Sequence, residues 1–177
     1  MRTFKEGAGY KESRCGMTGI ALGSDHGGFE LKNDLLEFLK KAGYAVKDFG
    51  TCSKESCDYP LIGFDVAKAV SEGEFEKGIL LCKSGIGMAI IANKLPGVRA
   101  AACYNTELAR LSREHNDCNV LVIAASYTEG DKARDIVRVW LDTAHAGERH
   151  ARRVEQMKEL EARLKRERKH EPSKKRR

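Results

Sequence analysis

Residues 78–88 of the chain read GILLCKSGIGM, and this segment carries the clearest fold signal in the sequence. Its first five residues form an unbroken apolar run, which is typical of a strand covered on both faces, as in a parallel sheet. Closely spaced glycines at 85 and 87 follow, and a helical pattern begins among them and continues to Asn93. A buried strand that turns directly into a helix is the repeating unit of an α/β fold.

The same unit recurs on both sides of this segment. The strand candidates, most of them unbroken apolar runs, are Ile20–Gly23, Tyr44–Phe49, Gly78–Cys82, Val98–Cys103 and Val120–Ala125. Helical patterns cover residues 31–42, ended by Gly43, and then Leu61–Val70, Gly87–Asn93, Glu107–Glu114 and Asp131–Leu141. Because crossovers between parallel strands are right-handed and cover both faces, five such units predict an open, doubly wound α/β sheet. Ligands bind such sheets at the carboxyl ends of the strands.

Length and composition fit one globular domain. The 177 residues suffice for a single substantial core, and no apolar run approaches the roughly 20 residues that cross a bilayer. Residues 1–16 contain no hydrophobic signal segment, so a cytoplasmic location is expected. There the six cysteines should remain thiols, and none forms a Cys-x-x-Cys pair that would indicate zinc or redox chemistry. We therefore expect no metal and no organic cofactor.

The net charge of +6 belongs to the end of the chain. From Gly147 onward there are 13 Lys and Arg against 6 Glu, which leaves 19 Lys and Arg against 20 Asp and Glu in the first 146 residues. A basic terminal run is usually a solvated helix face, so neither nucleic acid nor membrane is expected as a partner. Val154, Met157, Leu160 and Leu164 fall near one face of this run, which predicts a helix that packs on the domain or on a second subunit.

These patterns divide the chain into four parts. Residues 1–16 form an N-terminal extension, and residues 17–146 form the α/β domain. Residues 147–171 form a C-terminal helix that carries two candidate anion-binding arginines, and residues 172–177 form a basic tail.

Two loops that follow predicted strands hold residues able to move protons. Asp25 and His26 lie in a glycine-rich loop, where they can handle hydroxyl protons or contact an anion, although Asp25 can equally cap the next helix. Cys82 ends its strand beside Lys83 and several backbone amides, conditions that favour a thiolate base, whereas a small buried apolar residue is the simpler alternative. Amides of residues 85–88 at a helix start suit an enediolate oxygen.

Two further groups of polar residues lie at predicted helix ends. His115 ends the fourth helix, where it is either a cation that complements the helix dipole or an acid–base group. Arg149 and Arg153 are four residues apart near the start of the terminal helix, so both guanidinium groups can reach one anion. The alternative is an ordinary charged face in solvent.

Several segments occur together in one order between Gly19 and about Met157. They are GSDHGGF at 23–29, DFGT at 48–51, DYP at 58–60, SGIGM at 84–88, ANK at 92–94, GVRAA at 97–101, SREHND at 112–117, NVL at 119–121 and Arg149-His150 with Arg153. In this order they resemble the type B ribose-5-phosphate isomerases and their galactose-6-phosphate isomerase relatives.

The resemblance implies a single Rossmann-like three-layer α/β/α sandwich with a mostly parallel five-stranded sheet and a long C-terminal helix. It implies a homodimer or dimer of dimers with active sites at the subunit interface. The implied reaction interconverts ribose 5-phosphate and ribulose 5-phosphate through a cis-enediol, in the pentose phosphate pathway and without a cofactor. The implied roles are Cys82 as base with Ser84 in support, Asp25 and His115 in ring opening, the amides of Gly85, Ile86, Gly87 and Met88 at the enediolate oxygen, Tyr59 and Asn116 on sugar hydroxyls, and His26, Arg149 and Arg153 on phosphate.

Three positions depart from the family pattern. Lys83 stands where many members have glycine, Glu148 replaces a glycine, and Ser126 replaces an arginine that commonly reaches the phosphate in the neighbouring subunit. The substrate could therefore be another sugar, namely a hexose 6-phosphate, a tetrose phosphate or a free aldose. A non-catalytic sugar-phosphate-binding protein is the alternative from another class, but it would need no base such as Cys82 with Ser84.

Overall fold

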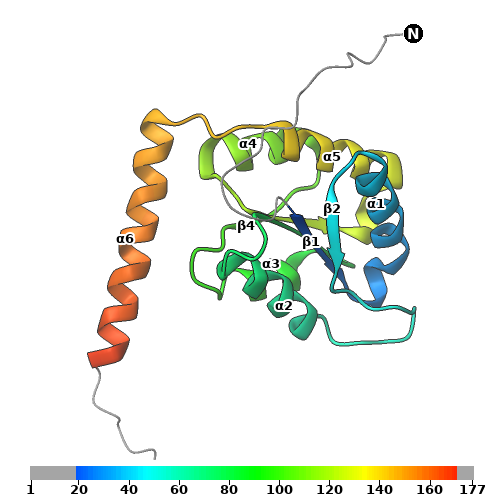
Figure 1. Cartoon of the computed structure of the whole chain (residues 1–177), viewed down its shortest axis with the longest axis horizontal. Coiled ribbons are helices and arrows are strands. Elements are labelled where there is room, and N and C mark those ends of the chain that lie inside the picture. The colour runs from blue at the N-terminus through cyan, green and yellow to red at the C-terminus, as the bar shows by residue number, and fades with distance from the viewer. Residues whose placement is uncertain (1–18, 171–177) are drawn as a thin grey trace, which may run out of the picture.

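Five strands form the central sheet of the computed structural model, which describes residues 19–170 (Figure 1). The sheet is ordered β2-β1-β3-β5-β4, and every neighbouring pair is parallel, so it is wholly rather than mostly parallel. The strands are β1 (Gly19–Ser24), β2 (Ala45–Asp48), β3 (Lys77–Cys82), β4 (Ala100–Ala102) and β5 (Val120–Ala124). The predicted extension at 1–16 and the tail at 172–177 lie outside the described residues.

Of the helical segments in the described residues, the six α-helices match the predicted helices to within two residues at each end, and the short 3-10 turns η1 and η2 were not predicted. The segments are η1 (His26–Gly28), α1 (Phe29–Lys41), α2 (Tyr59–Ser71), α3 (Ile86–Ala92), α4 (Thr106–Asn116), η2 (Ala125–Tyr127), α5 (Gly130–Asp142) and α6 (Glu148–His170). Helix α1 ends where the sequence predicts, because Gly43 adopts φ = +86°, a left-handed conformation that other residues rarely adopt.

Two apolar cores lie on the two faces of the sheet. Successive residues of the central strands point to opposite faces, so Ile79 and Leu81 of β3 contact one core while Leu80 and Cys82 contact the other. Helices α1, α4 and α5 cover the first face, and α2 and α3 cover the second (Figure 1). This arrangement confirms the predicted α/β/α sandwich and explains why the central strands are continuously apolar.

Two edge strands differ from the prediction. The expected strand Val98–Cys103 shrinks to β4, because the Arg99 amide donates to Asn119 Oδ1 at 2.8 Å instead of joining the ladder. The expected strand Tyr44–Phe49 shrinks to β2, and three of its four residues are exposed. Strand β2, which includes Lys47 and Asp48, is therefore not covered on both faces, and it closes one edge of the sheet.

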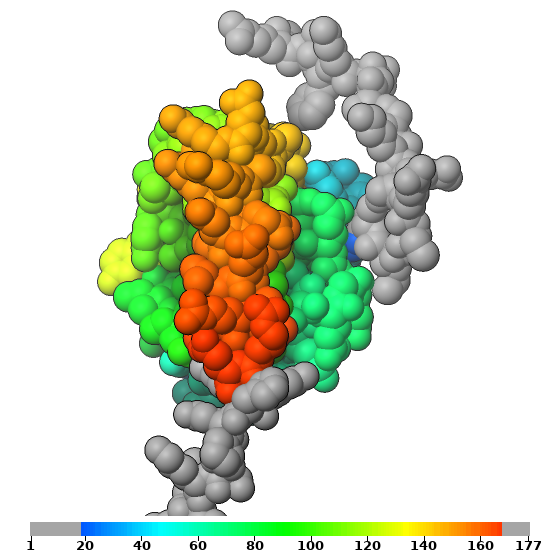
Figure 2. Space-filling view, turned by 90° about the vertical axis from the view of Figure 1, so that its left-hand side faces the viewer, coloured from blue at the N-terminus to red at the C-terminus, as the bar shows by residue number. Residues whose placement is uncertain are grey.

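Helix α6 lies along one side of the molecule, across the face seen in Figure 2. Of its predicted apolar stripe only Val154 is buried, at 4% exposure, and α6 packs against α4. Further along, the Gly97 amide donates to the Glu161 carboxylate at 2.9 Å. A groove of about 680 Å³ lies between α6 and the segment from Asn93 to Ala101. The rest of the stripe, Met157, Leu160 and Leu164, stays exposed beside this groove.

Candidate functional site

The carboxyl edge of the sheet gathers one cluster of predicted site residues, which we call the Cys82 cluster. It consists of Asp25, His26, Tyr59, Cys82, Ser84 and the segment Gly85–Met88. Asp25 follows β1, Cys82 ends β3, and these two strands pair in parallel with Ser24 beside Leu81. The sequence therefore folds these residues together because parallel neighbours end at the same edge.

Asp25 caps the η1 turn. Its Oδ1 atom accepts hydrogen bonds from the amides of Gly27 at 2.9 Å and Gly28 at 3.2 Å, and the residue is only 6% exposed. The capping interpretation is therefore confirmed. Capping does not exclude chemistry, because the hydrogen bonds found in the described part of the chain leave Oδ2 available.

His26 is oriented by the loop that precedes α2. Its Nδ1 atom lies 3.2 Å from the Cys57 backbone nitrogen and 3.3 Å from the Cys57 carbonyl oxygen. A backbone amide can only donate, so the shorter contact has Nδ1 as acceptor, and in that tautomer Nε2 carries the ring proton. A donor on Nε2 suits an anionic or hydroxyl ligand.

Cys82 is buried at the end of β3 with a backbone amide directed at its sulfur. The Gly85 N–H donates to Cys82 Sγ at 3.2 Å, and the residue is 5% exposed. This turn requires Gly85 at φ = +76°. Beside it, Ser84 Oγ accepts from the Ile86 amide at 3.3 Å. An N–H directed at the sulfur stabilises negative charge that develops on it, as a base requires.

Tyr59 lies at the start of α2 with its ring against Gly87 of α3. A Cβ atom at residue 87 would lie 2.6 Å from two ring carbons and 3.0 Å from the hydroxyl oxygen, so only glycine leaves room for the ring there. Tyr59 is 39% exposed. Its hydroxyl is therefore held beside the first turn of α3 while remaining accessible to a ligand.

A second cluster, which we call the His115 cluster, lies where α4 meets the start of α6. It consists of His115, Asn116, Arg149, His150 and Arg153. The rings of His115 and His150 are stacked with centroids 4.1 Å apart and planes 1° apart, and Arg149 Nε donates to His150 Nε2 at 3.3 Å. This stacking was not predicted, because no sequence pattern places two helix ends face to face.

The surroundings of His150 favour its neutral form. It is 8% exposed, and burial, then the nearby His115, Arg149 and Arg153, and finally His145, lower the pKa of its imidazole. Its Nδ1 atom is buried without a hydrogen-bond partner in the described residues. A histidine with a lowered pKa adds less positive charge beside Arg149 and Arg153, which suits joint binding of one anion by these two arginines.

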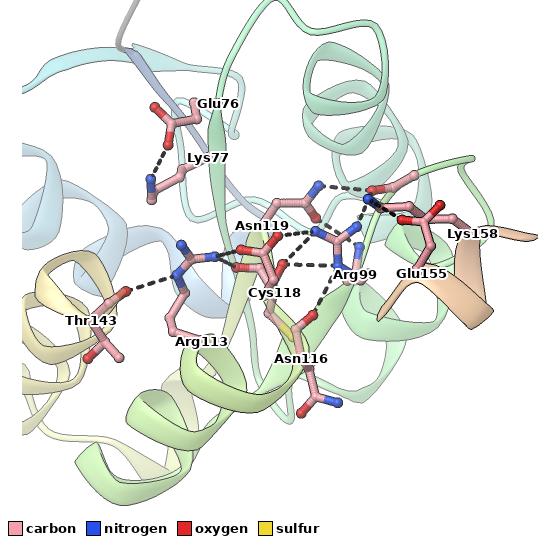
Figure 3. A network of polar contacts seen from close by, with 12 residues as sticks. Glu76, Lys77, Arg99, Arg113, Asn116, Cys118, Asn119, Thr143, Glu155 and Lys158 are labelled. Atoms are coloured by element: carbon pink, nitrogen blue, oxygen red, sulfur yellow. Dashed lines mark hydrogen bonds and ion pairs between the residues drawn. The ribbon is translucent and has the colours of Figure 1, made fainter. Parts of the chain in front are cut away.

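Arg99 and Arg113 fix the end of α4 on which His115 and Asn116 stand (Figure 3). Asp117 adopts a left-handed conformation at φ = +47°, and its carboxylate receives hydrogen bonds from Arg99 at 2.9 Å and Arg113 at 2.8 Å. Arg99 Nε also donates to the Asn116 carbonyl oxygen at 3.0 Å. Both arginines occur in segments that carry the resemblance, but the sequence alone gives no signal for this positioning role.

The two clusters lie at opposite ends of the strands, the Cys82 cluster at the carboxyl ends and the His115 cluster toward the amino ends. Cys82 is at the carboxyl end of β3. Helix α4 ends four residues before Val120, and Val120 pairs with Gly78 near the amino end of β3. Four residues of strand span roughly 13 Å. The chain therefore brings Asp25, His26, Tyr59 and Cys82 together, but it does not bring them to His115, Asn116 or the two arginines of α6.

The described part of the chain holds neither a metal cluster nor a membrane-spanning helix. Between residues 19 and 167 no group of three or more His, Cys, Asp or Glu side chains is placed to hold a metal ion. No helix in the described part combines the length and apolar character of a membrane span. Five cysteines there are free thiols, namely Cys52, Cys57, Cys82, Cys103 and Cys118.

Comparisons with known proteins agree on one family. The Ribose/Galactose Isomerase family matches residues 20–157. The chain is similar to ribose-5-phosphate isomerase B of Escherichia coli, with 44% identity over 83% of this chain and 99% of the relative. It is also similar to D-erythrulose-4-phosphate isomerase of Pectobacterium atrosepticum, with 36% identity over 80% of this chain and 93% of that relative.

The fold agrees with solved structures of the same kind. The structure of Clostridium thermocellum ribose-5-phosphate isomerase B matches with a TM-score of 0.80 and 50% identity, covering 82% of this chain and 98% of that one. The family match covers both clusters and ends near the middle of α6. The chain is therefore an aldose–ketose isomerase that belongs to the Ribose/Galactose Isomerase family.

Proposed function

We propose that this sugar-phosphate isomerase interconverts ribose 5-phosphate and ribulose 5-phosphate in the pentose phosphate pathway. The observation that carries the proposal is the pairing of a buried cysteine with a backbone amide, the Gly85 N–H on Cys82 Sγ, at the carboxyl edge of a parallel sheet. Such a sulfur can take a proton from carbon when the substrate C2 lies beside it.

In this mechanism Cys82 removes the proton from C2 and the aldehyde oxygen O1 gains a proton, which gives a cis-enediol. The same thiol then returns a proton to C1 while the O2 hydroxyl loses its own, so a ketose forms without change in oxidation state overall. Amides of Gly85–Met88 receive the charge that develops on oxygen, and Ser84 supports the thiolate. Asp25, through its free Oδ2, and His115 open the sugar ring.

Substrate contacts come from both clusters. Tyr59 and Asn116 bind sugar hydroxyls, and His26 offers its Nε2 donor to the phosphate. Arg149 and Arg153 lie on one face of α6 and are exposed, so they can hold the phosphate jointly. Because Ser126 carries no charge, a phosphate of another aldose is the second candidate substrate. The relative named D-erythrulose-4-phosphate isomerase supports that alternative.

We further propose that the active site forms between two copies of the chain. The two clusters cannot meet within one copy, because the sheet separates them. An apolar patch beside the Cys82 cluster, formed by Leu61, Phe64, Ile86 and Ile90, is 41–72% exposed, and the α6 stripe is likewise uncovered. Two copies that bury these surfaces would join the Cys82 cluster of each copy to the His115 cluster of the other. A dimer, or a dimer of dimers, satisfies this requirement.

The proposed base is tested by Cys82→Ala, assayed against a panel of aldose phosphates for ketose formation. We expect the rate to fall by at least 10²–10⁴-fold with ribose 5-phosphate, while substrate binding and thermal stability stay close to those of the unaltered chain. Cys103→Ala, a matched control at another buried thiol, should keep most of the activity. Unchanged exchange of the C2 proton in the Cys82 variant would assign the base to another residue.

A further inference from the structure

Lys83 lies across the glycine turn of the Cys82 cluster. It follows Cys82 directly, and its Cγ and Cε atoms lie 2.5 Å and 3.3 Å from the position that a Cβ atom at Gly27 would occupy. The aliphatic part of the side chain therefore runs over Gly27, the glycine that follows Asp25 and His26. Only glycine at position 27 leaves room for this arrangement.

The ammonium group of Lys83 has no partner among the described residues. It takes part in no ion pair or hydrogen bond there, and the side chain is exposed. The nearest acid in the cluster is Asp25, whose Oδ1 atom already accepts from two backbone amides. Within the Cys82 cluster and its loop, Lys83 is the only lysine or arginine. Its charge is thus held at the site without being neutralised.

The backbone of Lys83 is fixed as well. Its carbonyl oxygen accepts a hydrogen bond from the Ser126 amide at 3.1 Å, which joins the end of β3 to η2. The turn η1, which carries Gly27, contacts η2 and β3. A cation on an anchored backbone, with its stem resting on a neighbouring turn, loses less conformational freedom on binding an anion than a free surface lysine does.

We propose that Lys83 binds the anionic end of the substrate and selects phosphorylated sugars. This inference rests on the proposed isomerase function and names a further binding residue for it. His26 directly precedes Gly27, and Lys83 Cε lies 3.3 Å from the Cβ position of that glycine, so a phosphate bound over Gly27 would be within reach of both side chains. The contribution comes from the same copy as Cys82, whereas Arg149 and Arg153 come from the other copy of the proposed dimer.

A different role for Lys83 predicts different kinetics. If its charge acted on the thiol of Cys82, removing it would lower kcat and move the pH dependence of kcat, while affinity for inorganic phosphate stayed the same. A phosphate-binding lysine has the opposite signature. Its removal raises KM and weakens the binding of inorganic phosphate, and it leaves the pH dependence of kcat unchanged.

The test compares Lys83→Gln, Lys83→Arg and the control Lys40→Gln, which removes an exposed lysine from the far end of α1. We measure kcat and KM for ribose 5-phosphate, and the binding of inorganic phosphate by calorimetry. For Lys83→Gln we expect KM and the phosphate dissociation constant to rise about tenfold with kcat within twofold. Lys83→Arg should retain most of the affinity, and Lys40→Gln should resemble the unaltered chain.

Gly27→Ala gives an independent check that keeps every charge. The Cβ atom of the new alanine would displace the aliphatic part of Lys83, so the affinity for inorganic phosphate should fall as it does in Lys83→Gln. Combining the two changes should cause no further loss of affinity. Unchanged phosphate affinity in Lys83→Gln, or a loss confined to kcat, would overturn the inference. Absence of isomerase activity in the unaltered chain would instead refute the proposed function, and the calorimetry would still report on Lys83.

Discussion

Replacing Gly87 by alanine should impair catalysis while the fold stays intact. The new Cβ atom would lie 2.6 Å from two carbons of the Tyr59 ring, whereas ordinary carbon contacts are about 3.4–4 Å, so the ring must move by about 1 Å. A misplacement of that size in a binding residue costs up to about 10²-fold in rate. We therefore expect kcat/KM for ribose 5-phosphate to fall by about 10–100-fold.

Thermal stability should change little in the same variant. Tyr59 is 39% exposed, so its ring can swing outward rather than strain the core. Alanine in place of a helical glycine also stabilises by about 0.5–1 kcal/mol, which offsets part of the lost ring contact. Since 1 kcal/mol shifts Tm by roughly 2–4 °C in a chain of this size, we expect Tm to stay within a few degrees.

The mechanism of this effect is tested by a double-mutant cycle. In a Tyr59→Ala background the clash is gone, so Gly87→Ala should cause little further loss of kcat/KM. Tyr59→Phe serves as the control that removes only the hydroxyl. An equal loss from Gly87→Ala with and without the Tyr59 ring would refute the steric explanation and indicate that the α3 turn itself is perturbed.

Two further outcomes follow from the His115 cluster. Arg153→Ala should lower kcat/KM for ribose 5-phosphate by about 10–100-fold and leave turnover of free ribose nearly unchanged, and an equal loss with both sugars would count against a phosphate contact. Folding lowers the pKa of His150, so near and below about pH 6.5 the folded chain binds fewer protons than the unfolded one. The free energy of unfolding should therefore carry no penalty from His150 above about pH 6.5 and should decrease as the pH falls below that value. Melting curves between pH 5 and 8 should show this loss, and His150→Asn should reduce it; an identical pH dependence in both proteins would contradict the assignment.

Local patterns predicted most of the fold. The run at 79–82 predicts a strand that is covered on both faces, because the residues that point to either face are all apolar. Gly43 predicts a helix end, because few other residues adopt its positive φ. The prediction fails at β2 and β4, where edge position matters. At β4 the hydrogen-bond ladder is interrupted, because the side chain of Asn119 accepts the hydrogen bond of the Arg99 amide. Such a contact between residues twenty positions apart has no local signal.

The candidate site was predictable as a set of residues but not as a set of neighbours. Asp25 and Cys82 are expected together, because parallel strands end at one edge. The stacking of His115 on His150 and the path of Lys83 over Gly27 depend on packing between separate elements. The sequence also identified Arg149 and Arg153 as a pair, since their spacing places both on one helical face. Their separation from Cys82 follows only from the fold, in which α4 ends beside the amino end of β3 and Cys82 lies at the carboxyl end of that strand.

The central claim is that each active site combines the Cys82 cluster of one copy with the His115 cluster of another, and subunit mixing tests it directly. Cys82→Ala and His115→Ala chains, each inactive alone, are co-expressed so that they pair at random. About half of the dimers are then mixed, and each mixed dimer holds one intact site, so the preparation should recover about a quarter of the unaltered activity with ribose 5-phosphate. Activity no higher than that of the separate variants would contradict a shared site.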